Sequence, residues 1–109
     1  LVDLMYFKET DVAAEVPLDA WPYRELELEL RMHELKGDSG SYVTVLLETA
    51  ASLGGKGLDP WRAVGRFTPM KGPGVDRRAF RHLQRYVRWR ALANISGVHA
   101  LFSLVGMAR

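Results

Sequence analysis

The sequence predicts an all-β protein, a two-sheet antiparallel β-sandwich of the jelly-roll type. Several segments have an apolar residue at every second position, Gly- and Pro-rich stretches separate them, and there is little helical periodicity. A period of two gives a strand one apolar and one polar face, and many short strands joined by such loops are typical of sandwiches. The chain of 109 residues has the size of one domain and contains no cysteine, so it forms no disulfides.

The clearest predicted strand covers residues 24–33. Four aliphatic side chains alternate there with charged or polar residues and so share one face: Leu26, Leu28, Leu30 and Met32. Glu and Leu are good helix formers, but a helix would distribute these four side chains around its whole circumference. We therefore predict a strand.

The next predicted strand follows a tight turn. Residues 36–40, of sequence Lys-Gly-Asp-Ser-Gly, have turn chemistry because Gly and Asp tolerate left-handed backbone conformations. Residues 41–49 are rich in β-branched side chains, with an inward face of Val43, Val45 and Leu47. A short turn between two alternating segments predicts that they pair as a hairpin.

Alternation resumes at residues 61–68, after a Gly-rich loop at residues 52–60. One side of this predicted strand is formed by Trp61, Ala63, Gly65 and Phe67, and the other by Arg62, Val64 and Arg66. Residues 69–76, with two Pro and two Gly, are predicted to form another loop.

The last third is predicted to contain two strands. Residues 79–95 form a long strand-like run whose inner face comprises Val87, Trp89, Ala91, Ala93 and Ile95. A short helix at residues 76–83 is the alternative for its beginning. A Ser96-Gly97 turn and a strand at residues 100–105 then predict a C-terminal hairpin.

The N-terminal segment has a weaker pattern. We assign residues 1–22 to an N-terminal arm or edge strand, and residues 23–109 to the sandwich domain. The aromatic residues Tyr6, Phe7 and Trp21 would suit an arm that packs on a neighbouring molecule. An ordinary edge strand of the same domain is the alternative.

Charge is distributed unevenly along the chain. Residues 1–59 contain 12 acidic and 5 basic residues, whereas residues 60–109 contain 10 basic residues and one acidic residue, Asp76. Acidic and basic strands that lie side by side would neutralise each other. The alternative is a dipolar surface that docks on copies of itself or on a charged partner.

No catalytic, metal or cofactor motif stands out. The histidines His33, His82 and His99 have no metal-ligand spacing, and no Gly-x-Ser-x-Gly elbow is present. We therefore expect a non-enzymatic protein without metal or cofactor. No apolar run approaches the roughly 20 residues of a membrane span, so we expect no membrane partner.

Two ligand classes remain as alternatives to protein partners. Arginines interleaved with aromatic residues around Arg88, Trp89 and Arg90 suit single-stranded nucleic acid, although alternation puts Trp89 on the opposite face. Exposed indoles stack on sugars, and Trp21 is the tryptophan that we expect to be most exposed.

The C-terminal third resembles a known group of proteins. Residues 86–90 (Tyr-Val-Arg-Trp-Arg), the Ile95-Ser96-Gly97 turn and the tail at residues 102–109 are similar to small β-sandwich structural proteins of tailed phages and prophage-like particles. The likeness covers roughly residues 24–109. It implies a virion component assembled in the host cytoplasm: a capsid decoration, spike-base or connector protein whose partners are the major capsid protein and copies of itself.

The sequence therefore predicts a structural protein that acts by assembly, with a carbohydrate- or nucleic-acid-binding module as the alternative. The residues predicted to contact a partner lie in the N-terminal arm and on a basic face: Tyr6, Phe7, Trp21, Arg62, Arg66, Arg88 and Arg90.

Overall fold

The computed structural model describes residues 2–7, 11–14, 17–53 and 60–108. These residues form nine strands: β1 (Val2–Phe7), β2 (Asp11–Ala13), β3 (Leu18–Asp19), β4 (Leu26–Lys36), β5 (Val43–Ala50), β6 (Arg62–Arg66), β7 (Gly74–Phe80), β8 (Tyr86–Ala93) and β9 (His99–Ala108). The part of the chain that the structure describes has no helix, and hence none long and apolar enough to cross a membrane.

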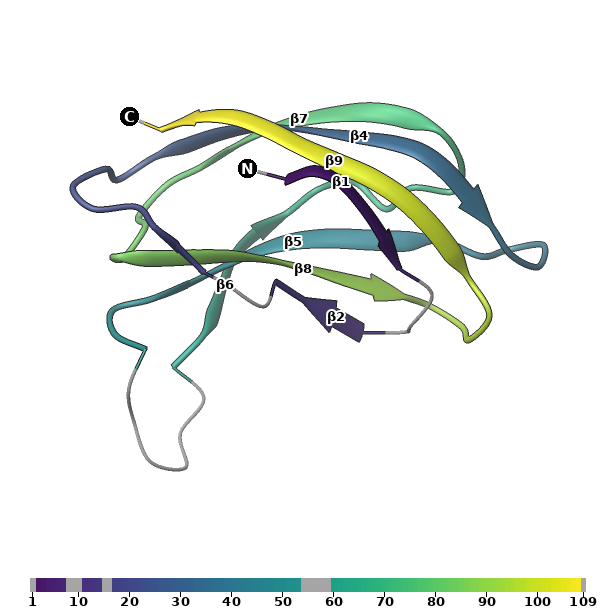
Figure 1. Ribbon diagram of the computed structural model, residues 1–109, viewed down its shortest axis with the longest axis horizontal. Helices are drawn as coiled ribbons and strands as arrows, with labels where there is room; N and C mark the ends of the chain where they lie inside the picture. Colours follow the sequence, from purple (N-terminus) through teal and green to yellow (C-terminus); the bar gives the residue numbers. More distant parts are fainter. Residues whose placement is uncertain (1, 8–10, 15–16, 54–59, 109) are drawn as a thin grey trace.

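The strands form two packed antiparallel sheets (Figure 1). Sheet A has the order β1-β9-β4-β7, and sheet B the order β2-β8-β5-β6, with β3 also pairing with β8. Successive strands cross from one sheet to the other, except that β2 and β3 share a neighbour and β5 is followed directly by its partner β6. This is the strand order of a jelly roll, so the predicted fold class is confirmed.

Both predicted hairpins are wrong. The strands β4 and β5 lie in different sheets, as do β8 and β9, so each turn carries the chain across the sandwich. At the first turn, the backbone N–H and the hydroxyl of Ser41 donate to the carbonyl oxygen of Asp38 at 3.0 and 2.6 Å. Alternation shows which side chains of a strand are buried. It does not show whether the next strand pairs with it in a hairpin or lies in the opposite sheet, because the buried face is the same in both cases.

The edge strand β7 was also not predicted. It begins at Gly74, inside the predicted loop, and it replaces the alternative helix at residues 76–83. Residues 81–85 then separate it from β8, so the predicted run at residues 79–95 is broken. The sequence of β7 shows no alternating apolar face, because Val75 is 62% exposed and Phe80 is the one buried residue of the strand.

A bulge changes the faces of β6. Leu47 pairs with Gly65 but its neighbour Glu48 pairs with Ala63, so β6 has one extra residue. Gly65 faces inward, because a Cβ there would lie 3.1 Å from the ring of Phe80. Ala63, predicted to share the side of Gly65, is exposed instead.

The core lies between the sheets where the strong alternation predicted it. The four aliphatic residues of β4 are at most 2% exposed, as are Val43, Val45 and Leu47 of β5. The rings of Trp89 and Phe102 meet edge to face across the sheets, with 5.4 Å between their centroids. The inward faces of β4 and β5 are therefore confirmed at these positions. The predicted inner face of β8 is confirmed at Val87, Trp89 and Ala91, whereas Ile95 is 38% exposed because it lies beyond the end of the strand.

Candidate interaction surface

The acidic first half and the basic second half of the chain meet across strands. Nε of Arg77 lies 2.7 Å from Oε1 of Glu29, and Nε of Arg81 lies 3.1 Å from Oε1 of Glu25. In each pair the acid comes from the first half and the base from the second. The predicted mutual neutralisation of acidic and basic strands is confirmed, although exposed pairs of this kind contribute little to stability.

The arginines Arg88 and Arg90 lie on the outer face of sheet B in a charge network. Nε of Arg88 donates to Glu48 at 2.8 Å, while Arg90 binds both Glu48 and Asp11. Glu48 is only 5% exposed, and the Arg88 guanidinium lies 4.5 Å from the ring centroid of Trp61. Both arginine charges are therefore neutralised within the chain.

The same network ties β2 to β8. Nε of Arg90 donates to Oδ1 of Asp11 at 2.8 Å, and this hydrogen bond holds the pKa of the Asp11 carboxyl below its usual value. The pKa of Arg90 is raised by the same bond. A guanidinium held in this way is already occupied when a phosphate approaches, which weakens the nucleic-acid alternative.

The β6 bulge separates the other two predicted arginines. Arg66 pairs with Leu46 and joins the outer face of sheet B, whereas Arg62 pairs with the fully buried Thr49. The guanidinium of Arg62 donates to the carbonyl oxygen of His82 at 3.5 Å. The predicted basic face is therefore not one continuous surface, since Arg62 leaves the strand on the other side.

The three aromatic residues predicted for the arm have different surroundings. Tyr6 and Phe7 lie in β1 and pair with Leu101 and Ala100 of β9, in the same chain. Trp21 lies between β3 and β4 and is 60% exposed. It is the most exposed of the three tryptophans, as predicted, because Trp61 is half-buried and Trp89 is buried.

Figure 1 shows that β4 and β8 begin, and β5 and β9 end, at the same end of the sandwich. Five large exposed apolar side chains lie on these strand ends, next to them in sequence, or opposite them in register. We call this the aromatic end and define it by Leu18, Trp21, Tyr23, Leu53 and Met107. These five residues are among eight large apolar side chains that are exposed in the described part of the chain. Five of the eight therefore lie toward one end of the sandwich.

Main-chain hydrogen bonds hold the β3–β4 connection in place. Ala20 is buried, and its N–H donates to the carbonyl oxygen of Arg85 at 2.7 Å. The N–H of Tyr23 donates to the carbonyl oxygen of Ala20 at 2.7 Å, and that of Trp21 to Oδ1 of Asp19 at 3.1 Å. On the other side of Trp21, the N–H of Leu83 donates to the carbonyl oxygen of Arg24 at 3.2 Å, so the connection that carries the indole is anchored on both sides.

Charged groups surround this indole. The guanidinium of Arg24 lies 5.1 Å from the Trp21 ring centroid, within the range of a cation–π contact. Arg85 donates to Oδ2 of Asp19 and, with the backbone N–H of Trp21, holds the pKa of the Asp19 carboxyl below its usual value. Tyr23 and the Asp19–Arg85 ion pair were not predicted from the sequence. The two residues of the ion pair lie 66 positions apart, so no local pattern indicates that they meet.

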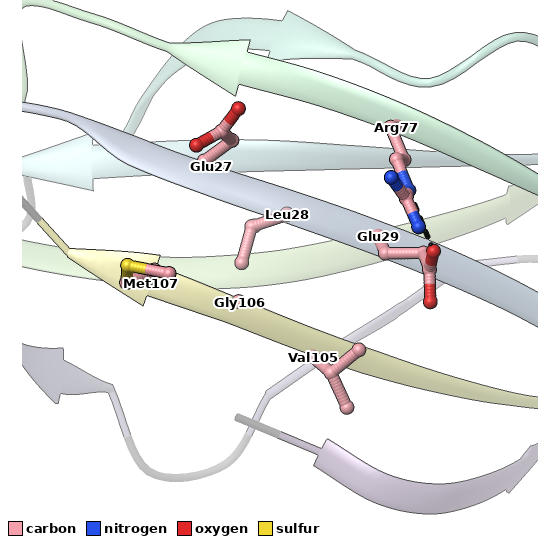
Figure 2. Close-up of a pocket in the computed structure, with 7 residues that line it drawn as sticks. All are labelled: Glu27, Leu28, Glu29, Arg77, Val105, Gly106 and Met107. Carbon is pink, nitrogen blue, oxygen red and sulfur yellow. Dashed lines mark hydrogen bonds and ion pairs between the residues drawn. The ribbon is translucent and has the colours of Figure 1, made fainter.

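A shallow groove on sheet A adjoins the aromatic end (Figure 2). Its volume is about 400 Å³, and it is lined by Glu27, Leu28, Glu29, Arg77, Val105, Gly106 and Met107. Figure 2 shows the Arg77 side chain reaching toward Glu29, with Val105 and Met107 coming from β9. One wall is thus charged and one apolar, which suits a side chain or an extended segment of another protein.

One contact resembles part of a catalytic arrangement. Nε2 of His33 lies 2.9 Å from Oγ of Ser103, on adjacent strands of sheet A. A nucleophile–base pair also needs a group that orients the base, and none of the described acids hydrogen-bonds to His33. Within the described ranges no three His, Asp or Glu side chains are grouped to hold a metal ion. That the chain is not an enzyme stays a prediction.

Comparison with known protein families and curated sequences identifies no relative of this chain. No protein-family model matches the chain, and no curated protein matches its sequence.

Proposed function

We propose that this chain is a non-enzymatic structural component of a phage or phage-like particle that docks through its aromatic end on another particle protein. The candidate positions are capsid decoration, spike base and connector, with the virion as its location. One observation carries the proposal: Trp21 is 60% exposed on a connection that main-chain hydrogen bonds anchor from both sides.

The composition of the aromatic end supports a protein partner. Trp, Tyr and Arg dominate the energetic centres of protein interfaces, and Trp21, Tyr23 and Arg24 lie within four residues of one another. Because the connection is already anchored, little conformational freedom is lost when a partner covers it. Met107 and the adjoining groove extend the apolar surface beside it.

The fold and the charges agree with this proposal. Jelly rolls are common in viral capsid proteins, although the same fold occurs in lectins and enzymes, so this support is an analogy. Arg88 and Arg90, two of the four arginines predicted for the basic face, are neutralised by Glu48 and Asp11, which favours a protein partner over nucleic acid.

The test is to locate the chain in particles. Phage-like particles prepared from the organism that encodes the chain are probed with an antibody against it, by immunoelectron microscopy and by sedimentation. The Trp21→Ala variant should lose incorporation by at least tenfold, because truncation of an interface centre costs about 2 kcal/mol or more. Tyr42→Ala, at the opposite end, is the matched control and should be incorporated normally. Absence of the wild-type chain from the particles would refute the proposal.

Carbohydrate binding is the second candidate, and the exposed Trp21 indole favours it. A glycan that stacks on Trp21 would shift tryptophan fluorescence, and Trp21→Ala would remove the shift while leaving the emission of the buried Trp89. A fluorescence shift in the wild-type chain together with normal particle incorporation of Trp21→Ala would favour the carbohydrate alternative.

A further inference from the structure

We infer that two copies of this chain associate edge to edge through β1 and form a closed two-fold dimer. The dimer adds a partner and a site to the proposed function, and it does not depend on the aromatic end, which lies on other strands.

The position of β1 in its sheet is the first step. It is the terminal strand of sheet A and pairs with β9 on one side, with Met5 opposite Phe102, Tyr6 opposite Leu101 and Phe7 opposite Ala100. On its other side no strand of the described chain pairs with it. A terminal strand presents unpaired N–H and C=O groups, which are a template for a strand from another molecule.

The other sheet edges are protected, which is the second step. Sheet A ends on its far side in β7, where Asp76, Arg77 and Arg78 are consecutive. In sheet B, β6 begins and ends with an arginine, and at the opposite edge β2 and β3 each carry an aspartate within three and two residues. Charged side chains on an edge strand oppose pairing with a strand of another molecule.

The strand β1 has a smaller share of charged residues than any of the other edge strands. The six residues Val-Asp-Leu-Met-Tyr-Phe contain one acid and no Lys, Arg, Gly or Pro. Its register with β9 shifts between Val2 and Met5, so the regular part of the strand is Met5–Phe7. The free edge for a second copy is therefore centred on Tyr6.

The symmetry of the contact makes it closed. A strand that pairs antiparallel with its own copy does so about a two-fold axis, so each copy uses its β1 edge and none is left to propagate. Pairing of β1 with β7 of the next copy would build an open chain, but Asp76, Arg77 and Arg78 oppose it. A ladder of three residues on each strand is short, so the dimer should dissociate on dilution.

The absence of cysteine makes a direct test available. The wild-type chain is measured by light scattering over a concentration series, and single-cysteine variants are treated with a short bismaleimide. We expect the mass to double as concentration rises, and Tyr6→Cys to cross-link at least tenfold more than Val75→Cys. Val75 is the matched control because it lies on an edge strand and is 62% exposed.

Two outcomes would overturn the inference: a monomer at every concentration, or equal cross-linking of the two variants. Met5→Cys replaces Tyr6→Cys if that variant does not fold. Trp21→Ala separates this inference from the proposed function, because it should lose particle incorporation and still dimerise. A dimer that disappears with Trp21→Ala would place the contact at the aromatic end instead of β1.

Discussion

Replacing Gly106 with Ala tests how closely β9 lies against β4. Gly106 pairs directly with Leu28 in β4. A Cβ atom at this position would overlap the carbonyl oxygen of Glu27 and Cδ2 of Leu28, and the carbonyl carbon of Glu27 would lie at 3.3 Å. Because backbone atoms are among these neighbours, a change of side-chain rotamer cannot relieve the overlap. The two central strands of sheet A must therefore move apart.

The expected cost follows from two effects. Overpacking of a dense region costs about 1–3 kcal/mol, and each ladder hydrogen bond that is stretched between β4 and β9 adds about 0.5–1.5 kcal/mol. We therefore expect Gly106→Ala to lower the free energy of unfolding by about 2–4 kcal/mol. For a domain of this size that corresponds to a fall in Tm of about 10 °C or more.

The matched control is Gly72→Ala, because a Cβ atom at Gly72 would meet nothing within 4 Å. This variant should be unchanged or slightly more stable, since Ala reduces the freedom of the unfolded chain. Guanidinium unfolding followed by tryptophan fluorescence measures both variants. Equal stability of the two variants would refute the close approach of β9 to β4 and the groove geometry that depends on it.

Three further predictions concern the charges and the aromatic end. Glu48→Ala should destabilise the chain by about 2–4 kcal/mol, because it leaves the half-buried Arg88 and Arg90 without the acid that they share. A double-mutant cycle with Arg88→Ala measures the coupling energy between Glu48 and Arg88. Arg90 and Arg85 lower the pKa values of the Asp11 and Asp19 carboxyls in the folded chain. The two ionised carboxylates therefore stabilise the fold above about pH 4, the ordinary carboxyl pKa, and this stabilisation is lost as the pH falls through their pKa values in the folded state. Melting temperatures between pH 7 and pH 2 test this, and Asp11→Asn should flatten the acid side of the curve. Trp21→Ala should change the free energy of unfolding by less than about 0.5 kcal/mol, since the indole is mostly exposed, and a larger loss would mean that Trp21 is structural rather than a contact residue.

The sequence predicts which face of a strand is buried better than it predicts with which strands it pairs. The period of two from Leu26 to Met32 identifies the buried face of β4 without knowledge of the sheet, because burial requires only that one side be apolar. The partners of β4 are β7 and β9, which lie more than 35 residues further along the chain. No local pattern contains that information, so the neighbouring strand β5 was assigned instead.

The same limit applies to the candidate site. Trp21 was expected to be the most exposed tryptophan, and the structure leaves its side chain exposed. Acidic and basic strands were expected to lie side by side, and Arg77 and Arg81 do bind Glu29 and Glu25. The acids of β4 nevertheless lie in sheet A, whereas Arg88 and Arg90 lie in sheet B. Glu48 and Asp11 bind them instead, since they lie on the strands next to β8.

The uneven charge along the sequence has a structural consequence in this arrangement. Placing the acids of β4 beside a second acidic strand would bring like charges into direct opposition, whereas β7 brings Arg77 opposite Glu29. A slip of one residue between these strands would place Arg77 beside Leu28 or Leu30 and turn the apolar face of β4 toward solvent. Charge therefore discriminates against wrong neighbours and wrong registers in a fold whose pairings are almost all distant in sequence. This role explains the segregation of acids and bases without requiring a charged ligand.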